Sequence, residues 1–188
     1  MRTHDPYAAS SPRANPRGFT LIEILCVVII LGIAGAVIVP QLGTRDDLRA
    51  ASAARALMAD LIYAQNLAIT SQSNHYVAFD VTNRRYTVLN SALAIVQHPV
   101  EKSNFVMTYG PGGSPGLREC SLSSAAFLGT SSADMRTTIG FDELGTPLVR
   151  YGGVVETLTA GEVKVKSGNH ELTIRIEPYT GQITVSTP

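Results

Sequence analysis

One acidic side chain stands inside the longest apolar run of the chain. Residues 19–40 read FTLIEILCVVIILGIAGAVIVP and carry a single charge, that of Glu23. A carboxylate inside hydrocarbon is unfavourable by about 2.5–3.5 kcal/mol on insertion scales, so it is retained where it has a partner or a function. The natural partner is an amine at the same depth, which makes Glu23 a candidate for charge pairing. The alternative is that Glu23, near the start of the run, extends its carboxylate to the lipid headgroups.

The other groups that do chemistry in proteins form no recognisable site. Cys26 and Cys120 are far apart in the sequence, so no disulfide framework and no metal-binding or redox cysteine pair is predicted. His75, His98 and His170 fall at expected strand ends or turns, where we expect a solvated imidazole. Cys120 has no histidine near it in sequence, and we expect an unreactive thiol. The sequence also lacks phosphate-loop, zinc-protease and nucleophile-elbow motifs, so we expect no enzyme activity, no catalytic residue, no metal and no cofactor.

The composition indicates that part of the chain does not lie in water. Of the 188 residues, 45% are hydrophobic and only 16% are charged, whereas soluble domains average about 25% charged residues. The formal net charge is zero, and the basic residues are scattered singly. Nucleic acid is therefore not an expected partner.

The apolar run is long enough to cross a bilayer. As a helix, residues 19–40 are roughly 33 Å long, close to the thickness of the hydrocarbon core. Arg2, Arg13 and Arg17 precede the run against Asp5 alone, and the charges after it cancel. The positive-inside rule then places the N-terminus in the cytoplasm and the rest of the chain across the membrane.

A cleaved secretory signal is the alternative interpretation of this segment. Ala34, Gly35 and Ala36 are small enough for a signal-peptidase site. The run is longer than the apolar core of such signals, however, and it carries the carboxylate of Glu23. These two features favour an anchor over a signal.

The start of the run carries a resemblance to a known family. The residues RGFTLIE, followed by an apolar helix up to Pro40, closely resemble the N-terminal signature of type IV pilins and type II secretion pseudopilins. In that family a membrane peptidase cuts the precursor after the glycine, and the new N-terminal residue is N-methylated. The resemblance implies a leader peptide over residues 1–18, cleavage between Gly18 and Phe19, N-methylation of Phe19, an assembly role for Glu23 and a helix break at Pro40.

Beyond the span, the pattern predicts a helix followed by strands. Residues 41–72 are expected to continue the helix as an amphipathic segment, because small and apolar residues recur every three or four positions. These residues are Ala50, Ala54, Leu57, Leu61, Ala64 and Ala68. Residues 73–188 alternate in hydropathy and predict a β-rich head that ends in a three-stranded meander. Residues 110–135 are rich in Gly, Pro and Ser and predict a long, variable surface loop.

Together these elements predict an α+β fold. The expected architecture is pilin-like: a long N-terminal helix, with a membrane-spanning first half, packed on an antiparallel β-sheet head. The helix running into YAQNLAITSQSNHYVAFD, and the turn DELGTP, are similar to the GspH/FimT subfamily of minor pseudopilins and minor pilins. The major pseudopilin typically carries an acidic calcium-binding loop near its C-terminus, whereas here Glu177 is the only acid after Glu171.

The resemblance implies a structural minor pseudopilin of a type II secretion system, incorporated into the pseudopilus. The implied location is the bacterial inner membrane, with a single pass, a cytoplasmic N-terminus and a periplasmic head. The implied partners are other pseudopilins or pilins through their N-terminal helices, the prepilin peptidase, the inner-membrane assembly platform and the lipid bilayer. One alternative is a FimT-like minor type IV pilin whose loop 110–135 contacts DNA, an exported protein or a surface. A remote alternative is a periplasmic enzyme tethered by an uncleaved anchor.

Overall fold

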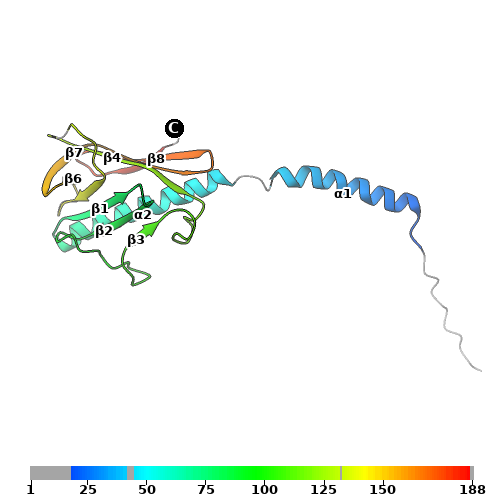
Figure 1. Cartoon of the computed structure of the whole chain (residues 1–188), viewed down its shortest axis with the longest axis horizontal. Coiled ribbons are helices and arrows are strands. Elements are labelled where there is room, and N and C mark those ends of the chain that lie inside the picture. Colours follow the sequence, from blue (N-terminus) through cyan, green and yellow to red (C-terminus); the bar gives the residue numbers. More distant parts are fainter. Residues whose placement is uncertain (1–17, 42–44, 132, 187–188) are drawn as a thin grey trace, which may run out of the picture. The chain divides into compact units, whose positions relative to one another are not determined.

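The computed structural model describes residues 18–41, 45–131 and 133–186, with backbone only for residues 37–41. The chain divides into two units, residues 1–43 and residues 44–188. The described part of the first unit consists of residues 18–20 and helix α1, Leu21–Gln41 (Figure 1). Apart from Gly18, the predicted leader lies outside the described residues, and so does the link between the two units.

The second unit begins with helix α2, Asp46–Ser71, which ends where Gln72 adopts a left-handed conformation. Its buried side chains form one stripe, and they are Ala50, Ala53, Ala54, Leu57, Leu61, Ala64 and Ala68. The amphipathic pattern predicted from the sequence is thereby confirmed, since all six predicted positions are buried. The sequence predicts that residues 41–72 continue the first helix. Residues 42–44 lie outside the described ranges, so the continuity of α1 and α2 stays a prediction.

In the described part of the head nine strands follow α2, and all of their pairings are antiparallel. The strands are β1 (His75–Asp80), β2 (Arg85–Leu89), β3 (Val106–Thr108), β4 (Ser121–Gly129), β5 (Thr138–Phe141), β6 (Pro147–Tyr151), β7 (Val154–Ser167), β8 (His170–Ile176) and β9 (Ile183–Ser186). They pair in the order β3-β2-β1-β5-β6-β7-β8-β9, and β4 pairs with β7. The α+β class and the predicted C-terminal meander, which is β7-β8-β9, are confirmed.

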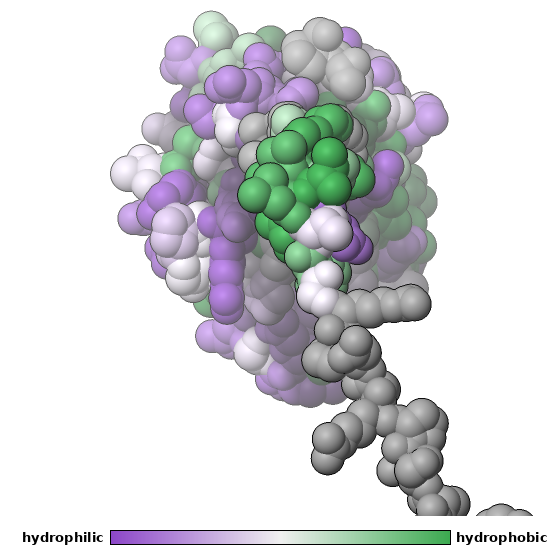
Figure 2. Space-filling model, turned by 90° about the vertical axis from the view of Figure 1, so that its right-hand side faces the viewer, coloured by the Kyte–Doolittle hydropathy of each residue, from purple (hydrophilic) through white to green (hydrophobic). Residues whose placement is uncertain are grey.

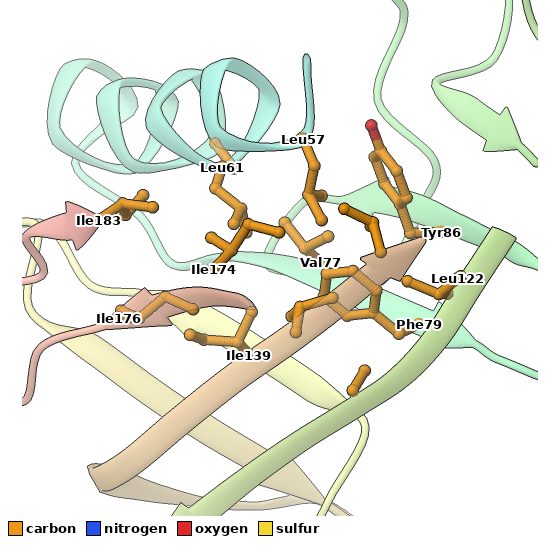
Figure 3. Packing of buried hydrophobic residues seen from close by; sticks show 14 of the residues in the cluster. Leu57, Leu61, Val77, Phe79, Tyr86, Leu122, Ile139, Ile174, Ile176 and Ile183 are labelled. Carbon is orange, nitrogen blue, oxygen red and sulfur yellow. The ribbon is translucent and has the colours of Figure 1, made fainter. Parts of the chain in front are cut away.

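Strand β7 joins two groups of strands. Its first residues pair with β6, Val154 opposite Tyr151, and its later residues pair with both β4 and β8. Helix α2 covers the inner face of the sheet and contacts β1, β5, β7, β8 and β9. Figure 3 shows Leu57 and Leu61 pointing from α2 into the same core as the strand residues. Both leucines are fully buried, which contributes about 1.5–3 kcal/mol for each side chain.

Strand β4 was not expected from the sequence. The prediction of one surface loop over residues 110–135 is wrong at residues 121–129, which pair along their whole length with β7. Leu122, Ala125 and Phe127 of β4 are buried. The pairing register shifts between Leu122 and Ser124, so the inward residues are spaced by three and then by two. This irregularity hides the alternation by which a strand is recognised in a sequence.

The first turn of α2 is tied to the sheet by a small polar cluster. Arg49 Nε lies 2.5 Å from Glu119 Oε2, next to the start of β4, and 3.4 Å separate Arg49 Nη1 from Asp46 Oδ1. Ser167 Oγ, at the end of β7, donates to Glu119 O at 3.0 Å. The Cys120 thiol donates to Arg49 O at 3.5 Å. We call these residues the α2 clamp, because they connect the start of α2 to two strands.

Candidate assembly site at the start of α1

The structure places the predicted site residues at the N-terminal end of α1. Gly18 and Phe19 precede the helix, and Glu23 lies in its first turn. The Glu23 backbone N–H donates to Thr20 Oγ1 at 3.3 Å and contacts Thr20 O at 3.1 Å. Thr20 therefore caps the helix, and the pattern T-x-x-E is that of a capping box, in which the acid turns back toward the helix start. Glu23 thus lies within one turn of Phe19, at the N-terminal end of the helix.

The cap by Thr20 was not predicted from the sequence, although its signal was present. A Ser or Thr followed three residues later by Glu, just before an apolar run, marks a helix start. In this segment the family motif and the capping pattern coincide, so the threonine has a structural reason to be there.

Gly18 has no conformational reason to be glycine. A Cβ placed on Gly18 would meet no atom within 4 Å, and its φ does not lie in the left-handed region. Nothing in the described part of the chain therefore requires a glycine here. Recognition of Gly18 by a processing enzyme would explain why this residue is glycine.

The described side chains of α1 form an exposed apolar surface around a single charge. The large apolar side chains from Leu21 to Ile33 range from 46% exposed for Val27 to 86% for Leu21. In Figure 2 the continuous green group corresponds to apolar side chains of this helix. A helix that is apolar on all sides is normally buried in protein or membrane. The described residues of the first unit thus leave the apolar side chains of α1 uncovered.

Within the residues that the structure describes, no helix is both long enough and apolar enough to cross a membrane. The side chains of residues 37–40, the last part of the predicted span 19–40, lie outside the described residues. Pro40 is one of them, and the backbone places it one residue before the end of α1. The span and the helix break at Pro40 stay predictions.

A buried polar pair attaches α2 to the sheet in the head. The Tyr86 hydroxyl donates to Asp60 Oδ2 at 2.5 Å. Burial raises the pKa of the Asp60 carboxyl above its ordinary value, while the Tyr86 hydrogen bond and the charge of His98 act in the opposite direction. Burial also raises the pKa of the Tyr109 hydroxyl, which finds no hydrogen-bond partner among the described residues. The pair has the character of a structural contact, because Tyr86 is fully buried.

The remaining residues considered from the sequence do not converge on a site. Cys120 is 3% exposed, and burial raises the pKa of its thiol, as expected for a structural cysteine. The expectation of a solvated imidazole is wrong for His75, which is 6% exposed and has its Nδ1 3.0 Å from Ser73 O. No group of three or more potential metal ligands occurs in the described ranges.

A family model and one known protein match parts of this chain. Residues 13–39 match the model of the prokaryotic N-terminal methylation motif. Over 35 residues the chain is 57% identical to type II secretion system core protein G of Pseudomonas aeruginosa. These 35 residues make up 19% of this chain and 25% of that protein. The match thus spans a quarter of that relative's length.

Two solved structures of the minor pseudopilin EpsH from the type 2 secretion system of Vibrio cholerae are similar to this chain. They have TM-scores of 0.48 and 0.49 and identities of 15% and 14%. They cover 74% and 77% of this chain, and 98% and 97% of their own. The chain thus carries a prokaryotic N-terminal methylation motif, and this motif covers the residues on which the resemblance to type IV pilins and type II secretion pseudopilins rests.

Proposed function

We propose that this chain is a structural subunit of a type II secretion pseudopilus, a minor pseudopilin of the GspH type. Residues 19–40 anchor it in the inner membrane, with the N-terminus in the cytoplasm and the head in the periplasm. A prepilin peptidase removes residues 1–18, and Phe19 becomes the methylated N-terminus. The observation that supports the proposal is that Glu23, in the first turn of α1 and four residues after Phe19, is the acid of a helix whose described surface is otherwise apolar and exposed.

The exposed surface of α1 requires a partner in two successive environments. Before assembly, lipid covers the apolar side chains, and after assembly the N-terminal helices of neighbouring subunits cover them. Cleavage after Gly18 creates an amine on Phe19, which is a cation next to the only acid of α1. Inside a helical bundle this amine needs a carboxylate at the same depth, and Glu23 of the same or a neighbouring subunit supplies it.

The named relative supports the secretion system rather than a pilus. The relative matched over 35 residues is a type II secretion protein, and the methylation motif matched over residues 13–39 includes Gly18, Phe19 and Glu23. The head carries the α+β architecture expected for this class. The proposed role is therefore structural: the chain is one subunit of a filament that takes part in the export of other proteins.

Processing is tested by the intact mass of the protein isolated from membranes. The expected mature chain comprises residues 19–188 with one added methyl group on its N-terminal amine. A strain without the prepilin peptidase is the control and should retain the full-length mass. A mature N-terminus near Val37, as a secretory signal would give, contradicts the proposal, and so does an uncut chain in the presence of the peptidase.

The role of Glu23 is tested by incorporation into filaments. Glu23→Leu should still insert and be cut, because it removes a charge from the membrane segment. It should fail to enter filaments, because an unpaired amine in the bundle destabilises the subunit contact by about 3–5 kcal/mol. Cys26→Ser is a matched control in the same helix and should incorporate normally. Incorporation of Glu23→Leu at the wild-type level, with the wild-type copy deleted, would show that the carboxylate only extends to the headgroups.

A further inference from the structure

Three strands lie at edges of the described sheet, and two of these edges are covered. At the edge formed by β3, the Thr108 N–H donates to Ser114 Oγ at 3.1 Å, and the Ser114 N–H donates to Thr108 O at 2.8 Å. At the outer side of β4, Phe127 and Arg136 exchange two backbone hydrogen bonds, at 2.9 and 2.8 Å. Strand β9, at the other end of the pairing order, has no such cover among the described residues.

The open part of this edge is the C-terminal end of β9. The Glu177 N–H donates to Gln182 O at 2.9 Å where β8 turns into β9. Bonding to the neighbouring strand alternates along an antiparallel pair, so Thr184 and Ser186 bond to β8, and the N–H and C=O of Val185 point away from it. Val185 is 37% exposed, and in the described part of the chain its backbone bonds to nothing beyond the β8–β9 pair. An exposed sheet edge of this kind can accept a further strand.

Two packed turns lie at the other end of β9. The turn Asp142–Thr146 connects β5 to β6, and the turn Glu177–Gly181 precedes β9. A Cβ on Gly181 would lie only 2.7 Å from Gly145 O, so the two turns pack with no room for a side chain. Gln65 Nε2 donates to Gly145 O at 2.8 Å and fixes these turns, which we call the turn pair, to α2. The turn pair therefore limits an added strand to the last residues of β9.

A groove beside the open edge can hold side chains of an added strand. It lies between α2 and the end of β9, has a volume of about 270 Å³, and is lined by Ala51, Arg55, Leu172, Val185 and Ser186. We call it the α2–β9 groove. Val185 lies opposite the buried Ile174 of β8, so its side chain is on the face of the sheet that α2 covers. Every second side chain of a strand added beside Val185 would point to this same face.

The charges around the groove favour a basic segment. Asp47 and Glu171 line a hollow of about 380 Å³ that adjoins the groove and shares two lining residues with it. Arg55 in the groove offsets one of these acids, so the joined space has a net negative charge when histidine is counted as neutral. None of the three forms an ion pair with a residue that the structure describes. A Lys or Arg beside Asp47 and Glu171 would complement this charge.

We propose that the open end of β9 and the α2–β9 groove bind an extended segment of a different protein, which adds an antiparallel strand beside β9. Its alternate apolar side chains enter the groove, and a Lys or Arg on its N-terminal side lies with Asp47 and Glu171. The orientation follows from the sheet, in which every described pairing is antiparallel. Strand β9 runs from the turn pair toward the hollow, since Ser186 lies opposite Thr173, so an antiparallel segment begins at the hollow.

A second copy of this chain does not suit the site. The open edge that it offers, among the strands described, is its own β9. Antiparallel pairing of two β9 strands would bring the hollow of each copy toward the turn pair of the other. Asp47 and Glu171 would then approach the exposed Glu177, and like charges disfavour such a contact. The occupant is therefore a chain of another kind, and the site does not involve α1.

Binding of blocked synthetic peptides to the full chain in maltoside micelles tests the site. The probe is a fluorescently labelled peptide of sequence KKTVTVT, whose valines should face the groove and whose lysines precede the strand. Its fluorescence anisotropy should rise as the chain is added and should not change with empty micelles. The reversed peptide TVTVTKK and the acidic peptide EETVTVT are the controls, and both should bind several-fold more weakly.

Methylation of the peptide backbone distinguishes an added strand from apolar adsorption. A peptide residue in the hydrogen-bonded pair with Val185 points its N–H at β9 and its side chain into the groove. N-methylation of both valines should therefore lower the affinity about tenfold, because it removes these donors. N-methylation of the two threonines that follow a valine is the matched control. It should change the affinity little, because their N–H groups point away from β9.

Two variants of the chain locate the binding site. Val185→Pro removes the outward N–H and no bond to β8, and proline is accepted at such edge positions, so it should abolish binding without changing the circular dichroism spectrum. Glu171→Lys should weaken binding of KKTVTVT several-fold and strengthen that of EETVTVT. Glu101→Lys, at an exposed acid of the loop between β2 and β3, is the control and should change neither.

Three results would overturn the proposal. The first is equal binding of the two N-methylated peptides, and the second is equal binding of KKTVTVT and its reversed form. The third is self-association of the full chain that Val185→Pro removes, since it would make a second copy the occupant. None of these results bears on the assembly role of α1, which the incorporation of Glu23→Leu tests separately.

Discussion

The bond between Tyr86 and Asp60 gives a stability prediction that the structure makes quantitative. Tyr86→Phe removes a fully buried hydroxyl that donates to a carboxylate on α2. Hydrogen bonds to charged groups contribute about 1.5–3 kcal/mol, so we expect a loss in that range at neutral pH. Tyr109→Phe is the matched control in the same cluster. Its hydroxyl has no partner among the described residues, so its removal should be neutral or slightly stabilising.

The loss caused by Tyr86→Phe should depend on pH. The pKa of Asp60 is raised in the folded state above 3.8, so the folded protein holds this proton more tightly than the unfolded chain does. The contribution of Asp60 to the free energy of unfolding is therefore highest below 3.8 and falls as pH rises through the folded pKa. The Tyr86 hydrogen bond lowers that pKa, which means that it is stronger with the carboxylate than with the acid. Tyr86→Phe should consequently destabilise the head more at neutral pH than below pH 3.8.

The assay is urea unfolding of a fragment of residues 44–188, followed by circular dichroism. Asp60→Ala should also destabilise, by about 1–3 kcal/mol, because it leaves the buried hydroxyl of Tyr86 without an acceptor. The double variant should lose clearly less than the sum of the single losses, since both changes break one bond. Additive losses, a loss from Tyr86→Phe no greater than from Tyr109→Phe, or equal losses at both pH values would refute the reasoning.

Three further predictions concern the head. The fragment 44–188 is itself expected to be a folded domain, because it forms a compact unit, and a circular dichroism spectrum without a sheet component would contradict this. Leu57→Ala should lower the free energy of unfolding by about 2.7–5 kcal/mol, because Leu57 is fully buried. Leu48→Ala, at a 64% exposed position of the same helix, is the control and should change this free energy by no more than about 0.5 kcal/mol. Similar losses from the two changes would show that α2 does not cover the core. Gly145→Ala should cost about 1–2 kcal/mol in urea unfolding, because Gly145 has a φ of 83°, and an unchanged midpoint would argue against this turn geometry.

The sequence predicts the parts of the fold that local periodicity controls. The stripe from Ala50 to Ala68 is recognisable because helical spacing alone decides which side is apolar. The strands of the meander are recognisable because charged and apolar residues alternate strictly in segments such as EVKVK. Strand β4 escapes this approach because its side chains are small, its register is broken, and its pairing with β7 determines its conformation.

The candidate sites also differ in how far the sequence alone identifies them. Gly18, Phe19 and Glu23 form a contiguous motif, so a short stretch of sequence is enough to identify them. The Tyr86–Asp60 pair joins a strand to a helix, and the turn pair joins two separate hairpin regions to Gln65. The sequence indicates the turns at Gly145 and Gly181 individually, but only the three-dimensional fold brings them together.

The α2 clamp has a mechanical consequence for the filament subunit that we propose, when such a filament is pulled or pushed. Tension applied through α1 reaches the head along the covalent chain at the start of α2. Arg49 and Asp46 pass this load to the start of β4 and the end of β7, which are neighbours in one antiparallel pair. The ladder hydrogen bonds of that pair lie perpendicular to the strands, so a load along the strands is shared by many bonds at once. Without the clamp, the first turn of α2 would peel from the sheet one contact after another, and the head would yield at a lower force.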